Sequence, residues 1–175
     1  MCSLRFRAAD GRFGAILGPI GIRRVLALCG RAGDHETGGI LVGRYSEDGA
    51  WAIVERVAEP PPGSRAGQTW FYRGTAGVLP ALEDLWVRRR RYYLGEWHFH
   101  PCGPSLPSST DRTSMARIGA SDSYRCPEPL LLVVGADPAG RWEMSMQVFP
   151  RGQLGIEMPI EPRAGQLQAT SASSS

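Results

Sequence analysis

The stretch GEWHFHPCGPSLPSSTD, residues 95–111, holds two of the three histidines in this chain of 175 residues. Its first half predicts a β-strand, on which successive side chains point to opposite faces of a sheet. His98 and His100 should therefore share one face. Trp97 and Phe99 should point the other way, into the core. A proline follows and ends the strand, so both imidazoles are expected near its carboxyl end.

The second half of this stretch predicts the start of a helix. Pro107, Ser108 and Ser109 precede Asp111, a pattern typical of a helix N-terminus. If the strand end meets the helix start, two imidazoles and a carboxylate come together. These are the protein ligands of an open catalytic zinc site. Taken alone, Ser108 and Asp111 are equally explained as an N-cap and a first-turn acid.

A metal-activated water also needs a base, and the segment DHETGGILVG, residues 34–43, offers one. Glu36 lies immediately before a glycine-flanked apolar run that predicts a strand. Its carboxylate should lie at the mouth of this strand, while Ile40 and Val42 hold the backbone in the core. Taken alone, Glu36 is better explained as an exposed loop carboxylate.

The rest of the chain predicts a mixed α/β (α+β) domain. Short β-branched runs bounded by turns predict strands, and apolar residues at three-to-four spacing predict helices. Residues 13–33 predict a short strand, a Gly-Pro turn and a helix that Gly30 and Gly33 would end. The run PPPGSRAGQ, residues 60–68, predicts a loop and a candidate substrate flap. The other expected elements are strands at 38–45, 51–60, 92–100, 130–136 and 141–149, a helix at 75–92 and a helix starting near 108.

Length and composition predict one cytoplasmic domain. The chain is 42% apolar, enough for a core, and no apolar run is long enough for a membrane span or a secretory signal. The net charge of +3 does not indicate a polyanionic partner. The run Arg88–Arg91 is better explained as a solvated helix end than as a nucleic-acid patch. We expect a domain over residues 1–162 and a disordered tail over residues 163–175.

Three motifs together resemble the signature of the JAMM, or MPN-plus, metalloprotease family. They are ETGGILVG from Glu36, GEWHFHP from Gly95 and PSSTD from Pro107, which match the family's glutamate, H-x-H-P and S-x-x-D elements. The flanking residues are most similar to its prokaryotic JAB branch. The resemblance covers roughly residues 14–150.

This resemblance implies a role for each candidate residue. Glu36 matches the general acid/base, and Ser108 matches the residue that steadies the oxyanion. The cofactor that it implies is Zn²⁺, and the matching metal ligands are His98, His100 and Asp111. The fold that it implies is a single domain with a curved mixed β-sheet flanked by helices.

The resemblance also implies a reaction and partners. The family hydrolyses an isopeptide or peptide bond after the C-terminal glycine of a ubiquitin-like protein. Its prokaryotic branch often accompanies E1- and E2-like enzymes, including those of anti-phage CBASS operons. The implied partners are thus a ubiquitin-like protein or its conjugate and such enzymes, with no nucleic acid and no membrane. The alternatives are processing of a ThiS- or MoaD-type sulfur carrier and a non-catalytic MPN scaffold.

Two residues depart from the family pattern. Phe99 stands where members more often have a small hydroxyl residue, but strand alternation directs it away from the ligands. Cys102 is a fourth ligand that closes the site, a thiol that oxidises, or a neutral loop residue, and the intact ligand set favours the third.

Overall fold

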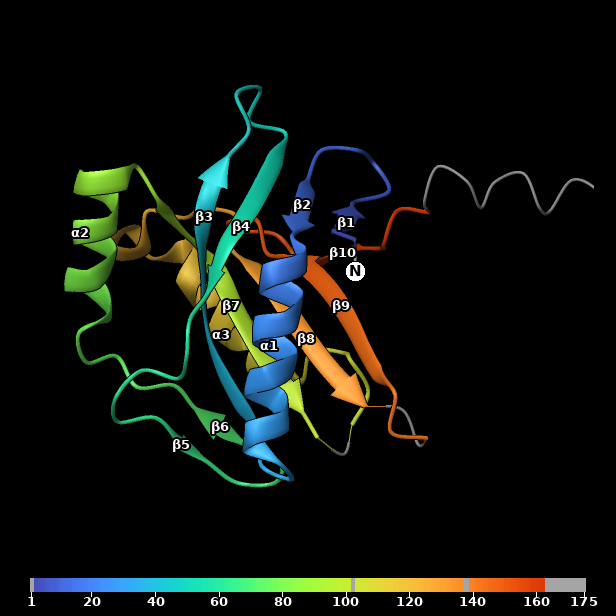
Figure 1. Cartoon of the computed structure of the whole chain (residues 1–175). Coiled ribbons are helices and arrows are strands. Elements are labelled where there is room, and N and C mark those ends of the chain that lie inside the picture. Colours follow the sequence, from blue (N-terminus) through green and yellow to red (C-terminus); the bar gives the residue numbers. More distant parts are fainter. Residues whose placement is uncertain (1, 102, 137–138, 163–175) are drawn as a thin grey trace, which may run out of the picture.

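The computed structural model describes residues 2–101, 103–136 and 139–162, and its main feature is a curved mixed β-sheet (Figure 1). Cys102 and the expected tail over 163–175 lie outside the described residues. The strand order in this sheet is β1-β2-β4-β3-β7-β8-β9-β10. The strands are β1 (Leu4–Arg7), β2 (Gly14–Leu17), β3 (Thr37–Tyr45), β4 (Trp51–Val57), β7 (Tyr92–His100), β8 (Leu130–Ala136), β9 (Trp142–Val148) and β10 (Ile156–Met158).

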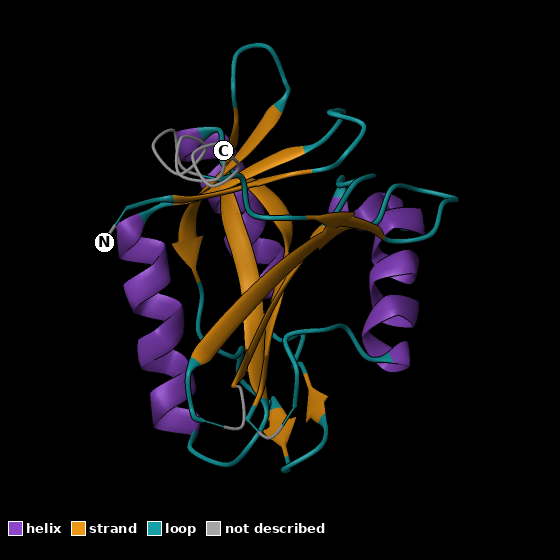
Figure 2. Ribbon diagram, turned by 90° about the vertical axis from the view of Figure 1, so that its right-hand side faces the viewer, coloured by secondary structure: helices purple, strands orange, loops and turns teal. Residues whose placement is uncertain are grey.

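Helices cover both faces of the sheet (Figure 2). Apolar residues of α1 pack on one face against Trp97, Phe99 and alternate residues of β8. Those of α2 and α3 pack on the other face against Tyr93 and the intervening residues of β8. The helices are α1 (Pro19–Ala32), α2 (Val78–Arg89) and α3 (Ser109–Ala120), followed by the 3-10 turn η1 (Asp122–Tyr124). In the described part of the chain, no helix has the length and apolar character needed to cross a membrane.

The expected single mixed α/β domain with a curved sheet is confirmed. The strands expected at 38–45 and 51–60 correspond to β3 and β4, which form an antiparallel hairpin in which β4 already ends at Val57, and β8 pairs antiparallel with β9. The sheet is mixed because β2–β4 and β7–β8 are parallel pairs. Strand β7 lies in the middle, between β3 and β8, so the histidine stretch is held from both sides.

Two helix boundaries differ from the prediction. Gly30 lies inside α1, since a helical glycine is only weakly unfavourable, and Gly33 ends the helix with φ 63. Helix α2 is shorter than the expected range 75–92. Gly77 before it (φ 72) and Arg90 after it (φ 51) both adopt the left-handed conformation, which a helix cannot contain.

Four short strands were missed. Strands β5 (Arg65–Ala66) and β6 (Phe71–Tyr72) form a small antiparallel hairpin, so the run over 60–68 is not a loop throughout. Strand β1 pairs with β2, and β10 pairs with β9. Strands of two to four residues are too short to display a period of two.

The two ends of the main sheet meet. Phe6 of β1 forms an antiparallel bridge with Ile160, just beyond β10. The N–H of Arg7 donates to the carbonyl of Pro159 at 3.0 Å, and the N–H of Glu161 donates to the carbonyl of Arg5 at 2.7 Å. The curved sheet is thus closed by pairing between the first and last parts of the described chain.

The close approach of β7 to β8 leads to a stability prediction at Gly95. This residue has φ 144, and a Cβ added to it would lie 1.9 Å from the carbonyl oxygen of Leu130. Gly95→Ala is therefore expected to lower the free energy of unfolding by about 2 kcal/mol or more, measured by denaturant titration. The control is Gly30→Ala in α1, where an added Cβ meets nothing within 4 Å. Equal unfolding midpoints for Gly95→Ala and the parent would contradict this close-packing account.

Candidate metal centre

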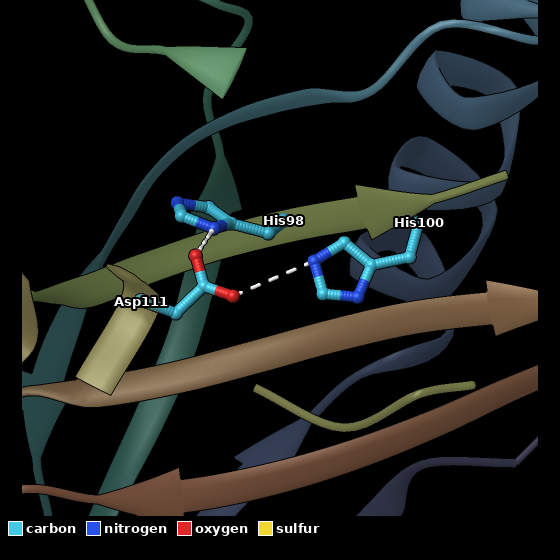
Figure 3. Close-up of side chains that lie close together, drawn as sticks. All are labelled: His98, His100 and Asp111. Atoms are coloured by element: carbon cyan, nitrogen blue, oxygen red, sulfur yellow. Dashed lines mark hydrogen bonds and ion pairs between the residues drawn. The ribbon is translucent and has the colours of Figure 1, made fainter. Parts of the chain in front are cut away.

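Three predicted ligand side chains converge where the end of β7 meets the start of α3 (Figure 3). Nδ1 of His98 lies 2.6 Å from Oδ1 of Asp111. Nε2 of His100 lies 3.5 Å from Oδ2 of the same carboxylate. One potential ligand atom from each residue falls within 4.8 Å of the others. Among the described residues, this is the group of histidine, cysteine and carboxylate side chains that could hold a metal ion.

Strand alternation places the two imidazoles. Trp97 and Phe99 are 0% and 2% exposed and pack in the core on the α1 side, as predicted. His98 and His100 therefore point to the opposite face, where their side chains are 12% and 13% exposed. The aromatic residues thus hold the strand, while the histidines remain accessible from one side.

Helix capping places Asp111. Ser108 is the N-cap of α3, and its Oγ accepts a hydrogen bond from the N–H of Asp111 at 3.1 Å. In return, Oδ2 of Asp111 accepts hydrogen bonds from the Ser108 N–H and hydroxyl, each at 2.7 Å. The capping explanation of these residues is therefore confirmed. It is compatible with metal binding, because the capping box fixes the carboxylate beside both imidazoles.

The electrostatics of this cluster suit a bound cation. Burial lowers the pKa of His98, but hydrogen bonds with Asp111 and Glu96 outweigh it and raise the pKa to about 9. Burial also opposes ionisation of Asp111, yet the two histidines hold its pKa well below the usual range. A metal ion that binds such an imidazole displaces its proton, and the positive charge of the metal then faces the carboxylate in place of the imidazolium charge. The donor set thus fits a transition-metal ion.

Glu36 lines a cavity of about 480 Å³ together with these groups. It directly precedes β3, and Ile40 and Val42 of that strand are buried as expected. Burial is the main cause that raises its pKa, and Asp111 adds to the effect while the histidines oppose it. The cavity is lined by Glu36, His98, His100, Ser108 and Asp111, and also by Gln68, Thr69, Trp70 and Phe71 of the β5–β6 hairpin.

Contacts with the β5–β6 hairpin and with Glu96 were not predicted. Phe71 packs edge-on against the ring of His98, with centroids 5.8 Å apart. The N–H of Glu36 donates to the carbonyl of Gly67 at 2.8 Å. Glu96 lies two residues before His98 on the same face of β7, and its Oε2 is 3.5 Å from Nε2 of that histidine. Strand alternation alone predicts that Glu96 lies on the same face of the strand as His98.

Several other ionisable residues lie on the surface. Nδ1 of the exposed His35 lies 2.8 Å from Oδ1 of Asp34. In the run Arg88–Arg91, Arg88 pairs with Asp84, as expected for positions four apart on a helix. Arg90 lies over the ring of Trp86.

Comparisons with known proteins support the JAB resemblance. The family described as prokaryotic homologs of the JAB domain matches residues 21–147. A protein of Enterobacter hormaechei subsp. hoffmannii named CD-NTase/cGAS isopeptidase is 44% identical over 137 residues, 78% of this chain and 76% of that protein. A Pseudomonas aeruginosa protein of the same name is 29% identical over 131 residues, 73% of this chain and 78% of that protein. A solution structure from Desulfitobacterium hafniense, 22% identical, shares the fold with a TM-score of 0.58, covering 82% of this chain and 86% of that one.

Proposed function

Because this chain belongs to the family of prokaryotic homologs of the JAB domain, we propose that it is a zinc-dependent isopeptidase. It cleaves after the C-terminal glycine of a ubiquitin-like protein and so releases that protein from a conjugate in a CBASS anti-phage pathway. The observation that carries this proposal is the convergence of His98, His100 and Asp111 at a cavity that Glu36 also lines. The relatives named CD-NTase/cGAS isopeptidase support the reaction class.

The zinc ion would be held by His98, His100 and Asp111. When bound, it supplies a Lewis acid that polarises a carbonyl group and acidifies water. Glu36 takes a proton from the attacking water and returns it to the leaving amine. Its partial burial favours this exchange, because a raised pKa brings the carboxyl group closer to the working pH.

Ser108 would stabilise the oxyanion by a change of hydrogen-bond partner. Its hydroxyl donates to Oδ2 of Asp111 at 2.7 Å. The backbone N–H of Ser108 donates to the same oxygen at 2.7 Å. The hydroxyl can therefore turn to the developing negative charge, while the N–H still fixes Asp111.

The β5–β6 hairpin would form the substrate-facing wall of the cavity. Trp70 lines the cavity and is 53% exposed. An extended glycine-containing tail can add to a short strand by main-chain hydrogen bonds, with specificity from neighbouring pockets. The proposed flap over residues 60–68 contains β5 and so overlaps this hairpin, and the carbonyl of Gly67 accepts a hydrogen bond from the N–H of Glu36.

Cleavage of defined substrates by the zinc-loaded chain tests this function. One substrate joins a ubiquitin-like protein, through its C-terminal glycine, to a lysine of a CD-NTase, the enzyme class in the relatives' name. The second substrate is the same ubiquitin-like protein with a linear peptide extension after its C-terminal glycine. Mass spectrometry should show the isopeptide cut directly after the glycine. Cleavage of the linear extension alone would indicate precursor processing, and binding without any cleavage would indicate a scaffold.

Zinc affinity is expected to rise with pH up to about 9 and then level off. Below its folded-state pKa of about 9, His98 in the metal-free protein carries a proton that zinc must displace. Displacing this proton makes the affinity change about tenfold per pH unit, and the dependence is steeper at lower pH, where His100, whose pKa is lowered by burial but raised overall by Asp111, must lose a proton as well. Chelator competition across this pH range measures the affinity, and calorimetry in buffers of different ionisation enthalpy counts the protons released. An affinity independent of pH would contradict a protonated His98.

A further inference from the structure

Glu96 is a buried carboxylate beside the candidate ligands, and the proposed mechanism does not use it. It lies on β7 two residues before His98, so their side chains share one face of the strand. Its side chain is only 5% exposed. A buried carboxylate is strongly unfavourable unless it is paired and hydrogen-bonded. The partners of Glu96 therefore indicate what it does.

The two oxygens of this carboxylate face different partners. Oε1 lies 2.7 Å from Nε of Arg73 and accepts a hydrogen bond from the Tyr93 hydroxyl at 3.2 Å. Oε2 lies 3.5 Å from Nε2 of His98. One oxygen thus anchors Glu96 in the protein interior, and the other is directed at the imidazole.

His98 presents its two ring nitrogens to two carboxylates. Nδ1 faces Asp111 at 2.6 Å, among the candidate ligands, and Nε2 faces Glu96. A metal-binding histidine usually donates the N–H of its other nitrogen to a carboxylate or carbonyl, which fixes the tautomer and the ring orientation. Glu96 is placed to accept that hydrogen bond.

Arg73 connects the same carboxylate to the β5–β6 hairpin. It directly follows β6, its side chain is 11% exposed, and its Nη2 donates to the Tyr124 hydroxyl at 2.8 Å. Phe71 of β6 packs against the ring of His98. The hairpin thus contacts His98 directly through Phe71 and indirectly through Arg73 and Glu96.

We propose that Glu96, held by Arg73, is a positioning residue that fixes the tautomer and orientation of the His98 imidazole for metal binding. The Arg73–Glu96 pair also links the β5–β6 hairpin to the candidate ligands. This inference rests on the proposed function in taking His98 as a zinc ligand. Removing the carboxylate frees the ring to turn, so zinc binding weakens even where the three ligands are intact.

Zinc affinity of the purified full chain tests this role, by competition with a chromophoric chelator at fixed pH. Glu96→Gln keeps the side-chain size and removes the charge. It is expected to weaken zinc binding about 10- to 100-fold. The matched control is Glu55→Gln on β4, which also removes a carboxylate paired with arginines, Arg44 and Arg91. The control should leave the zinc affinity unchanged within about twofold, because distant sites act independently.

Histidine-selective nitrogen NMR of the zinc-loaded chain gives a second readout that does not depend on activity. In the parent, the N–H on the non-ligating nitrogen of His98 should be protected from exchange with water, because Glu96 accepts its hydrogen bond. In Glu96→Gln this protected signal should be lost, because the single amide oxygen stays with Arg73 and Tyr93 and the amide NH₂, a donor, then faces His98. A merely structural role for Glu96 would lower thermal stability and leave the signal in place.

A second variant covers the case in which Glu96→Gln does not fold. That change leaves the charge of Arg73 buried and unpaired, so Arg73→Met is combined with Glu96→Met, which removes both charges and the hydrogen-bond acceptors at position 96. The double variant should fold and show the same loss of zinc affinity. Parent-like affinity in either folded variant would overturn the positioning role alone. Failure of the parent to bind zinc would overturn the proposed function, and this inference with it.

Discussion

Glu36→Gln is expected to reduce kcat for conjugate hydrolysis by about 10²- to 10⁴-fold. The glutamine side chain has nearly the same size, but it cannot accept a proton from water and return it to the amine. Glu36 is not among the three side chains that could hold a metal, so the zinc content of the variant should equal that of the parent. The measurement is single-turnover cleavage of the isopeptide substrate, together with metal analysis of the same sample.

The control for this prediction is Glu47→Gln. Glu47 lies in the turn between β3 and β4, outside the cavity that Glu36 lines. The Glu47→Gln variant should have the same kcat as the parent. At a zinc concentration that keeps the site occupied, the parent should also lose activity as the pH falls and Glu36 becomes protonated, and the residual activity of Glu36→Gln should lack this dependence. A Glu36→Gln protein with parental kcat would remove Glu36 from the proton-transfer role.

The double variant His98→Ala, His100→Ala is expected to lower the zinc content from about one ion per chain to almost none. Asp111 alone supplies a single carboxylate, and a structural or catalytic zinc site needs at least three protein ligands. Hydrolysis should be lost with the metal. Inductively coupled plasma analysis of dialysed protein measures the content, and circular dichroism checks that the fold is retained.

His35→Ala is the matched control, since His35 is the chain's third histidine and is exposed in its pair with Asp34. Its zinc content and activity should equal those of the parent. Equal zinc content in the double variant and the parent would mean that the metal binds elsewhere. In that case His98, His100 and Asp111 would not be the zinc ligands.

The arrangement of β7 could be predicted from sequence because it depends on local rules. Alternation along a strand placed His98 and His100 opposite two fully buried aromatic residues. The capping pattern at Ser108 placed the first turn of α3, and with it Asp111. Both rules act over a few residues, and a single sequence displays them directly.

The contacts made by the β5–β6 hairpin could not be predicted in this way. Its strands have two residues each, too few for a hydrophobic period. The pairing of Arg73 with Glu96 joins two separate segments of the chain, and no regular spacing in the sequence predicts such an ion pair. The distance between Gly67 and Glu36 likewise depends on how the hairpin packs, which only the tertiary structure defines.

The pairing of β1 with the segment beyond β10 can form only late in folding on the ribosome. Phe6 is synthesised long before Ile160, so their bridge cannot form until the strands and helices between them have emerged. The candidate metal ligands emerge well before that moment. A nascent chain halted short of Ile160 therefore presents β1 with one side unpaired, and such a strand can recruit neighbouring chains into aggregates.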